Sequence, residues 1–218
     1  MSLAHGANII LSDLSLHLDA ANTKSYPGTG TAWNNLSGNT QGTLINGPTY
    51  NTNESLSFDG VDDYFTIDLS CDKFYYSINW WLYPLSIQNY NQALVFNDGW
   101  NNWVFHTAAS GSVYIGTNTA TRLSPTEIPN GTVQVNKWQN FTYTFNSGIG
   151  SFYKNGLLIA SKSGMSISAN TFTTLSSGTA SSGALHGKLS NLSVYSNKVL
   201  SPTEIEKNFN AFRGRYGI

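Results

Sequence analysis

The most constraining feature of the sequence is its C-terminal stretch, residues 181–216, which reads as a strand, a turn and a short helix. Ser201 is suited to cap that helix, Pro202 to take its first position and Glu204 to complete a capping box. The residues that follow place an apolar stripe at i, i+4 and i+7, formed by Ile205, Phe209 and Phe212. We therefore expect the helix to dock on a sheet built by the preceding chain.

Most of the preceding chain consists of short alternating or apolar segments separated by turn residues. Residues 77–85 form a near-continuous apolar run, which is typical of a central strand covered on both faces. Asn155 and Gly156 both accept a positive φ, as a two-residue hairpin turn requires. Residues 22–42 are polar and rich in turn residues, and we expect little regular structure there. Many short strands with one terminal helix predict an all-β sandwich.

Composition limits the possible partners. Charged residues make up 11% of the 218 residues, aromatic residues 13%, and the net charge is −1. No basic run is present, so we expect no nucleic-acid partner. A surface rich in Asn, Ser, Thr and Gly suits hydroxyl-rich ligands better than phosphates. No break in composition marks a second domain, and we expect a single domain over residues 1–218.

The chain has one cysteine, Cys71, which allows no internal disulfide and which we expect to be a buried apolar residue. No apolar window approaches the length of a membrane span, so we expect no membrane insertion. The N-terminus lacks a positively charged start followed by a long apolar stretch. Either a signal was removed or the protein reaches its site without secretion, and we expect a virion surface or an extracellular location.

Several motifs follow one another in a recognisable order. An apolar strand ends in Phe58-Asp59-Gly60 and is followed by an aromatic strand at residues 78–82. Trp138-Gln139 then opens a strand that leads to the turn at residues 153–156, and a Gly-x-Leu strand starts at residue 187 before the final helix. In this order the motifs resemble the laminin-G-like and concanavalin-A-like lectin superfamily, and the match covers nearly the whole chain.

That resemblance implies an antiparallel two-sheet jelly roll, a fold used mainly to display glycan-binding surfaces. Residues 18–39 resemble a segment of bacteriophage and environmental virion-associated members. Many members carry an acidic pair in the late strand, where this chain has Ser190 and Asn191. Any calcium site or surface contact that the pair makes in relatives is therefore in doubt here.

The resemblance also includes glycoside hydrolases, which need two carboxylates on one face of a cleft. No predicted strand carries acids at alternate positions, and the acids of the final helix, Glu204 and Glu206, are explained by capping and by the helix dipole. Asp59 and Asp63 are separated by a glycine that breaks the strand. None of the four histidines lies in a catalytic motif: His5, His17, His106 and His186. We therefore predict that the protein is not an enzyme and keep a hydrolase as the less favoured alternative.

Three acids lie close together in the turn after the first motif. Asp59, Asp62 and Asp63 offer hard oxygen ligands of the kind that calcium prefers. Their spacing is not that of a complete calcium loop. The favoured interpretation is a turn stabilised by Asp side chains, with calcium as the alternative.

Aromatic rings beside amides are the usual means of holding a sugar, and one predicted loop combines them. We expect Trp100 to stack on a sugar, with Asp98, Asn101 and Asn102 forming hydrogen bonds and Tyr90 nearby. The alternative places Trp100 in the core. Three other tryptophans are expected in the core, with adjacent ones on opposite faces of their strand: Trp80, Trp81 and Trp138.

Taken with the resemblance, these features predict a non-enzymatic carbohydrate-binding or surface-recognition module, displayed on a phage virion as a decoration or fibre protein. Its expected partners are a glycan or host-surface polysaccharide and other virion proteins. The alternative is a purely structural virion component that binds protein and no sugar, which predicts a large exposed apolar patch.

Overall fold

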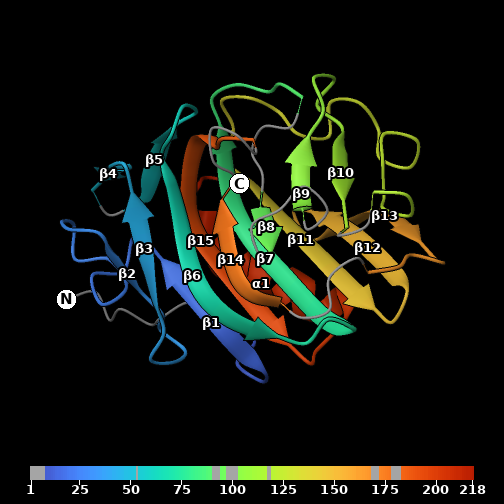
Figure 1. The fold of residues 1–218 in the computed structure, drawn as a ribbon, viewed down its shortest axis with the longest axis horizontal. Coiled ribbons are helices and arrows are strands. Elements are labelled where there is room, and N and C mark those ends of the chain that lie inside the picture. The colour runs from blue at the N-terminus through green and yellow to red at the C-terminus, as the bar shows by residue number, and fades with distance from the viewer. Residues whose placement is uncertain are drawn as a thin grey trace.

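The computed structural model describes residues 8–52, 54–89, 94–96, 103–116, 119–167, 172–177 and 183–218. This part of the chain forms two antiparallel sheets stacked face to face, with an α-helix, α1 (Pro202–Phe212), near its C-terminal end (Figure 1). A single 3-10 turn, Arg213–Arg215, follows the helix. The predicted two-sheet jelly-roll sandwich with a short C-terminal helix is therefore confirmed.

The first sheet, which we call the helix-covered sheet, contains eight strands among the described residues. In spatial order they are β13 (Leu157–Lys162), β12 (Ile149–Lys154), β11 (Gln139–Asn146), β7 (Tyr75–Pro84), β15 (His186–Ser196), β5 (Ser55–Asp59) and β4 (Thr49–Asn51), with β1 (Leu14–Asp19) also paired to β15. The predicted apolar run lies in β7, between β11 and β15, so its central position is confirmed.

The second sheet contains seven strands among the described residues. In order they are β10 (Val113–Ile115), β9 (Trp103–Thr107), β8 (Leu94–Phe96), β14 (Phe172–Ser177), β6 (Tyr64–Cys71), β3 (Gln41–Ile45) and β2 (Ala32–Asn34). The expectation of little regular structure at residues 22–42 was wrong in part. Trp33 is fully buried, and its burial fixes β2 against β3.

Adjacent tryptophans on β7 show how the layers are held together. Trp80 lies between the sheets, with its ring centroid 5.0 Å from Phe105 of β9 and 5.8 Å from Phe141 of β11. Trp81 points to the opposite face, where it stacks on Phe209 and Tyr216 at 5.7 and 4.2 Å. Both indoles are buried, as predicted. The outer face of this sheet is therefore a second core, closed by α1 and the C-terminal tail.

Two local signals in the sequence, the capping box of α1 and the hairpin turn between β12 and β13, are confirmed. Ser201 Oγ accepts the Glu204 amide at 3.3 Å, and Glu204 Oε2 accepts the Ser201 amide at 2.9 Å, which completes the capping box. The hairpin turn between β12 and β13 has φ of 50° at Asn155 and 82° at Gly156. This turn lies against the helix, because a Cβ built on Gly156 would lie 3.4 Å from the Phe209 ring.

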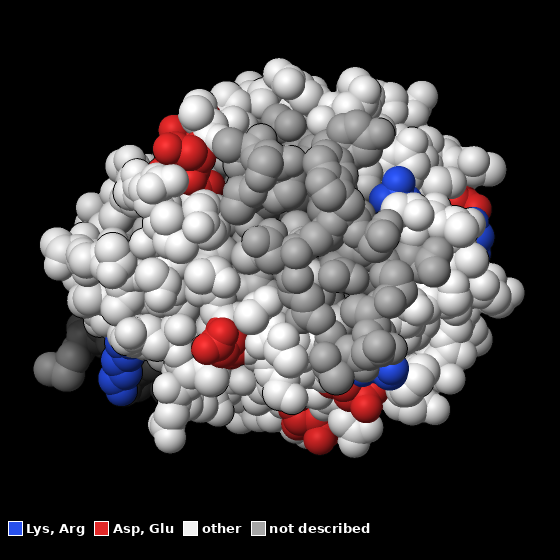
Figure 2. Space-filling view, viewed as in Figure 1, with Lys and Arg blue, Asp and Glu red and all other residues white. Residues whose placement is uncertain are grey.

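Charged groups are sparse on the surface. On the face seen in Figure 2 the described charged side chains are scattered singly or in small groups, mostly toward the edge. Among the described residues, no helix is both long and apolar enough to cross a membrane. Cys71 is free and buried, and burial raises the pKa of its thiol to about 12.

Candidate functional site

The predicted sugar-binding loop lies outside the part of the chain that the structure describes. This holds for Tyr90, Asp98, Trp100, Asn101 and Asn102. The following strand, β9, begins at Trp103 as expected. The loop site therefore stays a prediction.

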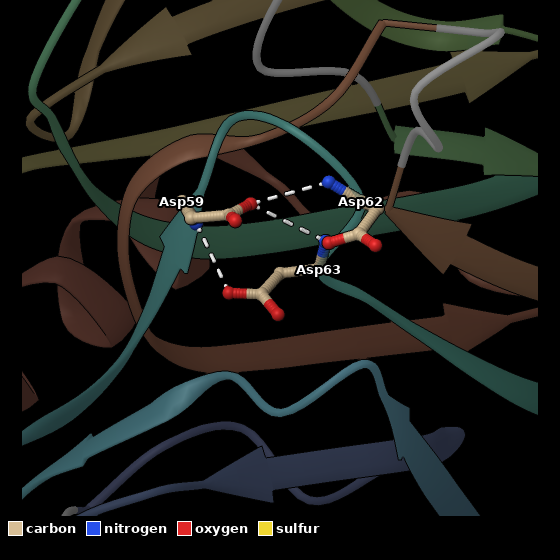
Figure 3. A group of neighbouring side chains, drawn as sticks. All are labelled: Asp59, Asp62 and Asp63. Carbon is tan, nitrogen blue, oxygen red and sulfur yellow. Dashed lines mark hydrogen bonds between the residues drawn. The ribbon is translucent and has the colours of Figure 1, made fainter.

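The three acids of the predicted metal site do come together, in the turn between β5 and β6 (Figure 3). One ligand oxygen from each of Asp59, Asp62 and Asp63 lies within 4.8 Å of the others. Asp59 Oδ1 accepts the amides of Val61, Asp62 and Asp63 at 2.8, 3.2 and 3.4 Å. Asp63 Oδ2 accepts the Asp59 amide at 3.1 Å. Two of the three carboxylates thus hold the backbone of their own turn.

Electrostatics in the turn follow from these contacts. Hydrogen bonding, first from the Val61 amide, lowers the pKa of Asp59. Burial, followed by the charge of Asp59, raises the pKa of Asp63. The side chains of Asp59 and Asp62 are exposed, and they retain oxygen lone pairs that could hold a calcium ion. The hydrogen bonds themselves match the interpretation as a stabilised turn, and the calcium site remains a hypothesis.

The positions where relatives carry an acidic pair are buried here. Ser190 and Asn191 lie in β15, and the hydroxyl of Tyr216 donates to Ser190 Oγ, while Asn191 Nδ2 donates to the Tyr216 oxygen at 3.3 Å. These two residues therefore anchor the C-terminal tail to the sheet. Burial raises the pKa of Tyr216 to about 12, so its phenol stays protonated at neutral pH.

A different site appears where β7 ends and β11 begins. An open cavity of about 420 Å³, which we call the rim cleft, lies between the end of β7, the segment 134–139, the β12–β13 turn and the C-terminal tail. Its lining consists of three aromatic residues, four amides, two amines and one aliphatic residue: Tyr83, Trp138, Tyr216, Gln134, Asn136, Gln139, Asn155, Lys137, Lys154 and Ile218. Its volume falls in the range of about 300–1,000 Å³ common for small-ligand sites.

The aromatic wall of the rim cleft is continuous with the second core. Trp138 lies 5.5 Å from Tyr83 and 4.6 Å from Tyr216, measured between ring centroids. Its indole Nε1 donates to Glu54 Oε1 at 3.0 Å. The expectation that Trp138 belongs to the core is confirmed only in part, because it packs against the second core but is half-buried and lines the cleft. The Tyr216 ring packs between Trp138 and Trp81.

Hydrogen bonds to the backbone hold the polar wall of the rim cleft in place. Buried Gln139 accepts the Gln134 amide at 3.0 Å and donates to the Gln134 carbonyl at 2.7 Å, which closes the 134–139 segment into a loop. The Asn136 amide donates to the Pro84 carbonyl at 2.8 Å and ties this loop to β7. The side chains of Asn136 and Lys137 make no hydrogen bond to any described residue. They are therefore free to contact a ligand.

The rim cleft carries positive charge. The Lys154 ammonium donates to the Thr132 carbonyl at 2.6 Å, and burial followed by the charge of Lys137 lowers the pKa of Lys154. Neither lysine pairs with a described carboxylate, and no Asp or Glu side chain of the described residues lines the cleft. Aromatic faces, amides and ammonium groups can bind a ligand, but they include no carboxylate pair for glycoside hydrolysis.

Comparison with known proteins supports the same fold. Residues 58–206 match a family described as the concanavalin A-like lectin/glucanases superfamily. No curated protein sequence matches the chain.

Many solved structures are similar to this chain, and three of them illustrate the likeness at low identity. A Trypanosoma rangeli sialidase in complex with sialic acid is 13% identical, with a TM-score of 0.68 over 91% of this chain and 33% of the sialidase. The botulinum neurotoxin serotype D binding domain is 17% identical, with a TM-score of 0.65 over 92% of this chain and 52% of that one. Domain 4 of AbnA, an extracellular arabinanase from Geobacillus stearothermophilus, in complex with arabinotriose, is 13% identical, with a TM-score of 0.65 over 90% of this chain and 98% of the domain. This chain spans about a third of the sialidase, and these likenesses concern the fold alone.

Proposed function

Since the chain belongs to the concanavalin A-like lectin/glucanases superfamily, we propose that it is a non-enzymatic carbohydrate-binding module that uses the rim cleft. The observation that carries the proposal is the placement of Tyr83 and Trp138 beside amide groups in an open cavity. Aromatic faces pack on the C–H surface of a sugar ring, and nearby amides exchange hydrogen bonds with its hydroxyls. An arabinanase domain of the same fold and nearly the same length was solved with arabinotriose, which adds to this support.

The loop predicted from the sequence is a second contact region in this proposal. Trp100 would stack on a sugar, and Asp98, Asn101 and Asn102 would form hydrogen bonds, with Tyr90 beside them. Replacing Trp100 with Ala should weaken glycan binding and leave the melting temperature nearly unchanged. A large loss of stability with unchanged binding would instead place Trp100 in the core.

The absence of enzymatic activity is part of the proposal, and the roles of the described acids support it. Glu127 Oε1 pairs with Lys162 at 2.8 Å, and Asp19 pairs with Arg215 at 2.7 Å. Glu204 caps α1, and Asp59 and Asp63 hold their turn. Each of these carboxylates thus has a structural partner. Turnover of a glycan that is lost on replacing one carboxylate would contradict this part of the proposal.

We place the module on the outside of a virion or in an extracellular setting. The likeness of residues 18–39 to virion-associated members supports a phage decoration or fibre protein that contacts a host-surface polysaccharide and neighbouring virion proteins. We also propose that residues 1–218 form one domain. Immunoelectron microscopy of the source particles would test the placement, and limited proteolysis would test the domain organisation.

A second candidate function is a structural virion component that binds protein. The observation that favours it is an apolar pair on β13, Leu157 and Leu158, whose surfaces are 72% and 56% exposed. They line a groove of about 500 Å³ between the β12–β13 hairpin and α1. Replacing both with Ser should abolish assembly if this alternative is correct, and it should leave glycan binding intact if the proposed function is correct.

The direct test is a glycan array with the purified protein and two tyrosine variants. Tyr83→Ala removes the cleft wall, while Tyr75→Ala removes an exposed tyrosine from the other end of the same strand. We expect the wild type and Tyr75→Ala to bind the same glycans and Tyr83→Ala to lose them. An array on which none of the three proteins binds would overturn the proposed function.

A further inference from the structure

This inference rests on the proposed function and concerns the kind of sugar that the rim cleft selects. We propose that the cleft binds a saccharide that carries a carboxylate, with Lys154 and Lys137 contacting the acid group while Trp138 and Tyr83 pack against the ring. The four residues come from β12, the segment before β11, and β7, and they line one cavity.

The first argument is local charge. The whole chain is nearly balanced, with 11 Lys and Arg against 12 Asp and Glu. Four basic side chains lie 2.7 to 3.9 Å from a carboxylate oxygen among the described residues: Lys162, Lys188, Lys198 and Arg215. Lys137 and Lys154 have no such partner among the described residues, yet they lie together in the cleft. An anionic ligand group would supply the missing countercharge.

The second argument is the way Lys154 is held. Its ammonium is partly buried and has three N–H donors, of which one is used by the Thr132 carbonyl at 2.6 Å. This contact fixes the position of the amine at the cleft and leaves donors for a ligand. Burial and the neighbouring charge of Lys137 both lower the pKa of Lys154, which means that they destabilise its charged form. A bound carboxylate would offset this destabilisation.

The third argument is what surrounds the amines. A strongly anionic partner such as nucleic acid or a heavily sulfated chain would need an extended basic surface, and the sequence contains no basic run that would build one. Two amines beside an aromatic wall and the amides of Asn136 and Asn155 instead suit a single carboxylate on a sugar ring that has free hydroxyls. Uronic and sialic acid units share this chemistry.

The experiment uses pairs of glycans that differ only in the acid. Each uronate- or sialate-containing oligosaccharide on a panel is compared with its carboxyl-reduced counterpart, and dissociation constants are measured by calorimetry. We expect at least one acidic member to bind about tenfold or more tightly than its reduced form, as a charge-assisted contact implies, and the preference to shrink as salt is added. Equal affinity within every pair would overturn the inference while leaving the proposed function intact, and no binding to any glycan would remove both.

Lysine variants separate a direct contact from a structural role. Lys154→Gln should remove the preference for the acidic member and leave the affinity for the neutral member unchanged, while Lys154→Arg should keep the preference. Lys24→Gln, at an exposed lysine between β1 and β2, is the matched control and should change neither affinity. If Lys154→Gln weakens both members equally, Lys154 acts only through Thr132, and the inference is wrong.

Discussion

The Asp59–Asp63 turn and the rim cleft both gather polar side chains at the end of a strand, but they use them in opposite ways. In the turn, Asp59 and Asp63 together accept four hydrogen bonds from backbone amides of the same five-residue segment. In the cleft, the backbone is held by the buried Gln139, so the neighbouring Asn136 and Lys137 side chains are left without described partners. A cluster of polar groups can bind a ligand only with donors and acceptors that the fold has not already used.

The largest expected effect concerns the packing that supports the cleft. Trp81→Ala should lower the free energy of unfolding by about 3–5 kcal/mol, because it removes a buried indole that supports both Phe209 and Tyr216. Denaturant unfolding would measure this loss. Trp81→Phe keeps much of the contact and should cost clearly less, and equal losses for the two variants would show that the outer face is not a packed core.

The second effect is a loss of stability in acid that comes from two buried histidines and not from the turn. Burial lowers the pKa of His17, and burial followed by the charge of Arg122 lowers the pKa of His106 to about 3. Since both histidines are held neutral in the folded state and gain a proton on unfolding, stability is full above pH 6.5 and falls as the pH drops below it. For His106 the expected slope is about 1.4 kcal/mol per pH unit between pH 6.5 and its folded-state pKa, and His17 adds to the loss in the same direction.

The pKa of Asp59 in the turn is lowered, so acid unfolding distinguishes its contribution from that of the histidines. The lowered pKa of Asp59 gives stability that is present above its usual pKa and is lost only below it. Asp59→Asn should therefore leave the decline between pH 6.5 and 4.5 unchanged. A variant that removed this decline would place its origin in the turn.

A third, smaller effect tests the turn itself. Asp59→Ala removes the acceptor of three backbone amides and should cost about 1 kcal/mol, comparable with the loss of a helix cap. Glycan binding should not change, because the turn is not part of the cleft lining. Thermal unfolding would measure the loss of stability, and the glycan array would measure binding. If Asp59→Ala lost both stability and glycan binding, the turn and the cleft would not be independent.

The smallest expected effect is that of calcium. An ion that binds only the folded state raises the melting temperature, and the rise grows with the ion concentration. Because Asp59 and Asp63 already hold the backbone of the turn and the spacing of the three acids is not that of a complete calcium loop, we expect nearly the same melting curve in millimolar calcium and in EDTA. A rise of several degrees that disappears in Asp62→Asn would establish Asp59, Asp62 and Asp63 as a calcium site.

Features encoded in a few neighbouring residues were predictable from the sequence. The capping box at Ser201 and Glu204 and the hairpin turn at Asn155-Gly156 depend on local backbone preferences, and both are confirmed. The central strand β14 was missed, because its sequence FTTLSS lacks a clear apolar pattern and its pairing with β6 and β8 comes from distant segments.

The candidate site was less accessible to sequence reasoning. Tyr83, Trp138 and Tyr216 are far apart in the chain and meet only because β7 and β11 pair and the C-terminal tail folds over them. Trp138 followed by Gln139 was visible as a motif, but nothing local to it distinguishes a half-buried indole from a core one. The acids of the turn, by contrast, were found at once because they are neighbours in sequence.

The most direct test of the rim cleft as a glycan-binding surface is an NMR titration of the tryptophan indole N–H groups with an array-identified glycan. The six tryptophans give six indole signals, and Trp138→Phe assigns the one that matters. The account predicts that the Trp138 signal shifts with glycan concentration, while those of the buried Trp33 and Trp80, which lie between the sheets, stay in place. A glycan that binds with the Trp138 signal unmoved would contradict it.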